Sequence, residues 1–91
     1  MAVEAMINRA EQVNIKLGTL LASLNPGSYS YDQVMDLQAR LAAVKERLTY
    51  QYHSKPRASE FELALSRRDV MELCDAIDQM IASVPQGEGR V

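Results

Sequence analysis

The sequence predicts an all-α protein: an antiparallel three-helix bundle, or a helical hairpin with a third helix, packed like a coiled coil. Three segments carry apolar residues alternately three and four positions apart, and breaks containing proline separate them. This spacing lays one narrow apolar stripe along each helix. The stripes are Val3, Met6, Ala10, Val13, Leu17, Leu20 and Leu24; Val34, Leu37, Leu41, Val44 and Leu48; and Val70, Leu73, Ile77, Met80 and Val84. We expect helices at about 3–24, 30–53 and 60–84 in one domain over 1–84, with a flexible tail at 85–91.

The first helix is predicted to end before the segment Asn25-Pro26-Gly27. A residue that precedes proline avoids helical angles, and glycine tolerates a chain reversal. Gly18 lies inside the helical pattern, where it is less favourable than alanine by about 0.5–1 kcal/mol. Close packing against another helix is the favoured explanation for Gly18, and a flexible hinge is the alternative.

The second helix is predicted to begin with a capping box, in which Ser30 is the N-cap and Gln33 lies three residues later. Tyr29 and Val34 are placed to form the hydrophobic staple that often accompanies such a cap. The stripe weakens near the end of this helix, because Gln51 falls where the next apolar residue is expected.

The third helix follows a short basic break, residues 54–58, that has proline at its centre. Ser59 and Glu62 form a second capping box. A rival start pairs Ser66 with Asp69, since Ser66 also occupies a position where the apolar stripe lapses. Pro85 is expected to end the helix.

Size and charge narrow the class of protein. A chain of 91 residues forms one small domain, and its net charge of −2 lacks the basic excess typical of nucleic-acid binding. No secretory signal is apparent, and no apolar run approaches the roughly 20 residues of a membrane span. A single cysteine, in a helical pattern, favours a reducing compartment. The expected location is therefore the cytoplasm.

The sequence does not predict an enzyme. It contains no glycine-rich phosphate loop, CxxC pair or nucleophile elbow, and we expect no catalytic, cofactor-binding or metal-binding residues. Cys74 has apolar stripe neighbours and is expected in the core. His53, the only histidine, suits the negative end of the second helix.

The third helix carries an excess of acidic residues. Residues 60–84 hold six acids and two arginines, a local balance of −4. Asp69 and Glu72 share one helix face, as do Asp75 and Asp78, because each pair is three residues apart. A solvated acidic face is the favoured interpretation, and a binding surface for a basic partner is the alternative.

The expected function is protein binding through exposed parts of the stripes. Narrow stripes suit contact with a partner's amphipathic helix or with a second copy of the chain. Tyrosine combines an apolar face with a polar tip and is common in interfaces. The favoured interpretation is that the tyrosines cover the ends of the core, and an interface role is the alternative. The candidate partner-binding residues are Leu17, Leu20, Leu24, Leu37, Leu41, Val44, Leu48, Tyr50, Tyr52, Asp69, Glu72, Asp75 and Asp78.

The segment from Leu20 to Leu48 resembles small helical type III secretion proteins. It contains Leu-Leu-Ala-Ser-Leu-Asn-Pro-Gly-Ser-Tyr and then Asp-Leu-Gln-Ala-Arg-Leu, in the order helix, proline turn, helix. Needle and inner-rod subunits share this layout with the hairpin co-chaperones of needle subunits. Tyr50-Gln51-Tyr52-His53 is also similar to the tyrosine-rich end of some of these co-chaperones. The resemblance implies chaperoning or assembly of a secreted subunit, although the third helix departs from the family layout.

Two other functions fit the same features. The protein could be an inhibitor or regulator, carried by a phage or plasmid, that binds a macromolecular machine through the acidic third helix. It could also be a structural subunit of a helical assembly.

Overall fold

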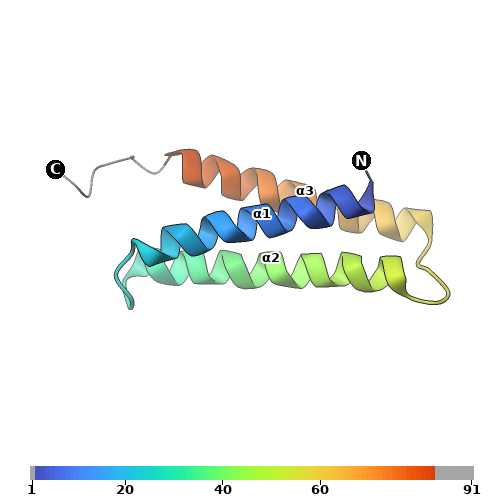
Figure 1. Ribbon diagram of the computed structural model, residues 1–91, viewed down its shortest axis with the longest axis horizontal. Coiled ribbons are helices and arrows are strands. Elements are labelled where there is room, and N and C mark those ends of the chain that lie inside the picture. Colours follow the sequence, from blue (N-terminus) through green and yellow to red (C-terminus); the bar gives the residue numbers. More distant parts are fainter. Residues whose placement is uncertain (1, 84–91) are drawn as a thin grey trace.

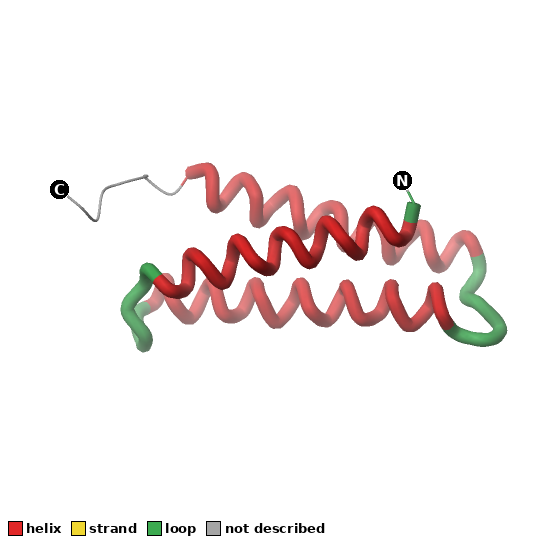
Figure 2. Tube along the Cα trace, viewed as in Figure 1, coloured by secondary structure: helices red, strands yellow, loops and turns green. Residues whose placement is uncertain are grey.

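The computed structural model describes residues 2–83, which form three α-helices: α1 (Val3–Ala22), α2 (Tyr29–His53) and α3 (Glu60–Ser83). Every pair of helices is in contact. α1 and α3 run in the same direction, and α2 is antiparallel to both (Figure 1). The two loops lie at opposite ends of the molecule (Figure 2). The prediction of an all-α three-helix bundle is confirmed, whereas the predicted tail and Val84 lie outside the described residues.

The bundle has one core, which the three stripes share. Ser66 is also buried among these apolar residues. α1 and α3 have matching patterns of burial 60 residues apart, so Val3, Ala10 and Leu17 correspond to Leu63, Val70 and Ile77. The buried apolar residues are Val3, Met6, Ala10, Val13, Leu17, Val34, Leu41, Leu48, Leu63, Val70, Cys74 and Ile77.

α1 ends at Ala22, two residues earlier than the predicted Leu24. The backbone N–H groups of Ser23 and Leu24 donate to the carbonyls of Leu20 and Leu21, and the Ser23 hydroxyl also donates to Leu20 O at 2.7 Å. These bonds between residues three apart tighten the last turn and satisfy carbonyls that the helix end leaves free. Leu24 therefore lies in the loop, half-buried against the core.

The favoured explanation of Gly18 is wrong. Gly18 is exposed, and a Cβ atom built on it would have no neighbour within 4 Å. Helix packing within this chain therefore does not require a glycine at position 18.

Gly18→Ala is expected to raise the free energy of unfolding by about 0.5–1 kcal/mol, because alanine favours the helix and meets no obstacle here. Urea unfolding followed by circular dichroism measures the change. A matched Ala22→Gly variant, at the exposed last position of the same helix, should lower the stability. A less stable Gly18→Ala protein would contradict the open space at this position.

α2 begins at Tyr29, and its cap lies two residues before the predicted cap. Ser28, not Ser30, is the N-cap, and its side chain accepts a hydrogen bond from Tyr31 N at 3.1 Å. Gly27 has a φ of 87°, and this left-handed conformation reverses the chain directly before Ser28. The predicted staple is absent as well, since Tyr29 is 77% exposed. Gln33 donates to Tyr29 Oη at 3.0 Å instead of closing a capping box.

The start predicted for α3 is confirmed. Glu62 N donates to Ser59 Oγ, and Ser59 N donates to a Glu62 carboxylate oxygen, both at 3.1 Å. The rival start at Ser66 is wrong, because Ser66 lies within α3 and is buried. Its hydroxyl donates to Gln51 Oε1.

Candidate functional site

An apolar groove lies at the end of the bundle where α1 ends, α2 begins and α3 approaches its end. Its volume is about 510 Å³. Figure 1 shows the orange-red end of α3 lying apart from the start of α2 at this end of the molecule. The apolar lining side chains come from all three helices and from the first loop: Leu20, Leu24, Val34, Leu37 and Met80.

Polar side chains of α2 complete the groove. Ser30, Gln33, Asp36 and Arg40 line it alongside the apolar residues. Arg40 Nε lies 3.5 Å from the Asp36 carboxylate one turn away, and both side chains are more than half exposed. The groove therefore has apolar side chains at its centre and one exposed ion pair, between Asp36 and Arg40, at its edge. Protein interfaces commonly combine an apolar core with a polar rim in this way.

The structure divides the predicted leucines into two groups. Leu20, Leu24 and Leu37 line the groove, where they are only partly buried. In contrast, Leu17, Leu41 and Leu48 are at most 1% exposed and belong to the core. Val44 packs against the core and is partly buried. Only the first group is accessible to a partner in this conformation.

Tyr50 and Tyr52 lie far from the groove, near the other end of α2. Tyr50 is 75% exposed and lines a shallow hollow between α1 and α2, together with Ile7 and Thr49. Tyr52 is half-buried, and the Arg57 guanidinium lies 4.5 Å from the centre of its ring. Arg57 Nε also donates to the Tyr52 carbonyl at 3.0 Å. Tyr52 thus anchors the second loop to α2.

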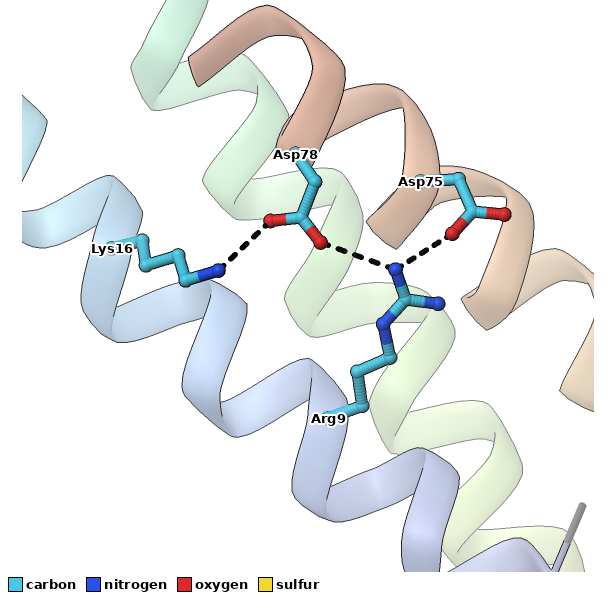
Figure 3. Close-up of polar contacts among 4 residues, drawn as sticks. All are labelled: Arg9, Lys16, Asp75 and Asp78. Carbon is cyan, nitrogen blue, oxygen red and sulfur yellow. Dashed lines mark hydrogen bonds and ion pairs between the residues drawn. The ribbon is translucent and has the colours of Figure 1, made fainter. Parts of the chain in front are cut away.

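Most of the acidic residues predicted as a surface on α3 are paired within the chain. Arg9 of α1 donates to Asp75 at 2.6 Å and to Asp78 at 3.1 Å, and Lys16 donates to Asp78 at 3.2 Å (Figure 3). Asp69 forms ion pairs with Arg47 of α2 and with its own neighbour Arg68. These carboxylates join α3 to the other two helices. The Asp75 side chain nevertheless stays 54% exposed and Glu72 is also exposed, so the interpretation as a solvated face holds for these two residues.

The ion pairs also alter two pKa values. For Asp78 the largest single cause is partial burial, which raises the pKa, but the bonds from Lys16 and Arg9 together outweigh it and hold the pKa below its ordinary value of 3.8. For Arg9 the hydrogen bond to Asp75 is the largest cause, and it raises the pKa of the guanidinium. Both directions favour the charged forms of the pair.

Lowering the pH below about 4 is expected to destabilise the bundle in part through Asp78. A carboxyl group whose pKa is lowered by folding contributes stability above its unfolded pKa and loses that contribution as the pH falls through its folded pKa. Urea unfolding at pH 7 and pH 3 measures the loss, which Asp78→Asn should reduce. The control is Asp36→Asn at the exposed pair with Arg40. An equal acid response in the wild type and Asp78→Asn would contradict this assignment.

Cys74 lies in the core, as expected. It is 0% exposed, and burial is the largest cause that raises the pKa of its thiol, with the nearby Arg9 acting in the opposite direction. A raised thiol pKa and a buried position both disfavour nucleophilic chemistry. His53 is the last residue of α2, and its ring contacts the Tyr52 ring edge-on at a centroid distance of 5.1 Å.

Sequence reasoning missed several groove residues. Val34 and Met80 belong to the predicted stripes but were not expected in a binding site. Asp36 and Arg40 were not singled out, although their spacing of four residues is typical of an exposed helical ion pair. The spacing alone does not indicate that both border an apolar hollow, since this depends on where α3 lies.

Within residues 2–83, no group of three or more His, Cys, Asp or Glu side chains is placed to hold a metal ion. No helix in the described part of the chain is long and apolar enough to cross a membrane. Comparisons with known protein families, curated proteins and solved structures found no match to this chain.

Proposed function

We propose that this protein is a small, non-enzymatic binding module that takes an amphipathic helix of a partner protein into the groove between α1, α2 and α3. The observation that carries the proposal is the gathering of Leu20, Leu24, Leu37 and Met80 around one accessible apolar hollow. Partly exposed apolar side chains from several helices provide a docking surface for a helix with apolar residues at i, i+3, i+4 and i+7.

The charged residues at the groove suggest which charges the partner helix carries beside its apolar face. Asp36 and Arg40 are exposed and lie beside each other, so each is accessible to a residue of opposite charge. We expect the bound helix to present an apolar face flanked by both acidic and basic residues. The apolar face would supply most of the affinity, because exposed charge pairs contribute little.

The resemblance to type III secretion proteins suggests the kind of partner. The segment 20–48 that carries the resemblance contains eight of the nine groove-lining residues, the exception being Met80. We therefore propose that the bound helix belongs to a secreted or assembling subunit, which the module covers before assembly.

A test first identifies the partner and then measures its affinity. A photo-reactive amino acid at Gln33, a groove residue, would be used to cross-link the partner in native cells, with the same group at Glu46 as the control outside the groove. The purified partner is then titrated against the wild type, Leu37→Asp and Ile15→Asp by isothermal titration calorimetry. Ile15 is 61% exposed and does not line the groove, so Ile15→Asp is the matched control.

We expect Leu37→Asp to weaken binding at least tenfold, about 1.4 kcal/mol, and Ile15→Asp to leave it nearly unchanged. Circular dichroism must show that both variants remain folded. Equal affinities for the wild type and Leu37→Asp, or an equal loss in both variants, would place the binding surface elsewhere.

A further inference from the structure

We infer that the hydrogen bond between Gln51 and Ser66 fixes the register in which α3 packs on α2. Each residue occupies a stripe position that is otherwise apolar. In the structure these two polar side chains contact each other, since the Ser66 hydroxyl donates to Gln51 Oε1. The pair therefore forms one polar layer within an apolar interface.

The polar layer is both buried and satisfied. Ser66 is 2% exposed and is the polar residue found among the buried core positions of residues 2–83, while Gln51 is half-buried. Within those same residues, no buried side-chain nitrogen or oxygen lacks a hydrogen-bond partner. A buried polar group costs little stability when it is hydrogen-bonded to another group. Removing one partner destabilises the folded protein, because the other group is then buried without a hydrogen bond.

Neither the Val44 layer nor the ion pair of Arg47 excludes both shifted registers by itself. When α3 moves by seven residues in the direction that brings Leu73 opposite Gln51, another apolar stripe residue, Met80, comes opposite Val44, because the stripe repeats at that spacing. The ion pair from Arg47 to Asp69 survives the shift in the opposite direction, since Glu62 precedes Asp69 by seven residues.

The Gln51–Ser66 layer does not survive a shift in either direction. In one direction Leu73 replaces Ser66 opposite Gln51, and the amide group loses its buried partner. In the other direction Ser59 replaces Ser66 opposite Gln51, and Ser66 moves to the apolar layer of Val44, away from the Gln51 side chain. Single polar residues at stripe positions of coiled coils set register in the same way, at a cost in stability.

The test replaces the polar pair with apolar residues and measures the register directly. Spin labels at Glu46 and Gln79, in a Cys74→Ala background, lie on α2 and α3 and are offset along the bundle axis. A slip of one heptad moves one label by about 10 Å along the axis, so the distance between the labels changes in pulsed electron paramagnetic resonance. The variants are Gln51→Leu with Ser66→Ala, Gln51→Leu alone, and Leu73→Met as a volume-conserving control in the neighbouring apolar layer.

We expect a single distance in the labelled parent and in Leu73→Met, and a second distance population in the doubly apolar variant. The doubly apolar variant should also melt several degrees higher than Gln51→Leu alone, in which the Ser66 hydroxyl loses its partner. A single, unchanged distance in the doubly apolar variant would overturn the inference, since the apolar layers and the loop would then suffice to set the register.

Discussion

Leu48→Ala is expected to lower the free energy of unfolding by about 2–5 kcal/mol, since it removes a fully buried side chain and leaves a cavity. Leu48 is 0% exposed and lies on α2, which is antiparallel to both other helices and contacts each of them. A domain of this size typically has a total stability of about 5–15 kcal/mol, so the variant is expected to be partly unfolded at 37 °C. Urea unfolding at 25 °C, monitored by circular dichroism, measures the difference.

The control for Leu48→Ala is Leu37→Ala in the same helix. Leu37 is only partly buried and lines the groove, so its truncation removes less apolar contact and should cost about 1 kcal/mol. Similar losses in the two variants would contradict the division of the α2 leucines into core and groove residues. The comparison also shows whether groove variants are stable enough for the binding test.

Cys74→Ser is expected to cost about 1–3 kcal/mol, although the two side chains are nearly the same shape. Cys74 is 0% exposed within the apolar core, so the new hydroxyl would be buried without the water that it bonds in the unfolded chain. Thermal and urea unfolding of Cys74→Ser and Cys74→Ala separate the two causes. Cys74→Ala loses the packing of the sulfur atom but introduces no polar group, and it should be the more stable variant.

The opposite order would show that the serine hydroxyl finds an acceptor. One candidate is the carbonyl of Val70, four residues earlier in α3, because a helical serine can donate to a carbonyl at that spacing. In that case a local hydrogen bond of the serine hydroxyl, and not the cost of removing the hydroxyl from water, would decide the stability of Cys74→Ser.

The helices were predictable because their signals are local. Stripe spacing located all three helices, and the capping box at Ser59 and Glu62 involves residues only three apart. The error at the start of α2 has a local cause too: Gly27 adopts a positive φ, which makes Ser28 the cap before the chain reaches Ser30. The stripe spacing alone does not indicate which of two nearby serines becomes the cap.

The site was harder to predict because it depends on contacts between distant segments. The stripe spacing does not distinguish Leu41, which is buried, from Leu37, which lines the groove. The difference in burial between these two leucines depends on where α3 lies relative to α2. The acidic residues of α3 posed the same problem, since Arg9 and Asp75 are separated by 66 positions in the sequence.

The parallel contact of α1 with α3 has a consequence for folding kinetics. Contacts within each helical hairpin close short loops, whereas the contacts of Arg9 with Asp75 and Asp78 span most of the chain. We expect the two hairpins to form before this long-range contact, since loop closure becomes more costly with length. Arg9→Met should then accelerate unfolding while leaving the folding rate nearly unchanged in stopped-flow measurements. A slower folding rate would instead place the contact between the first and third helices in the transition state.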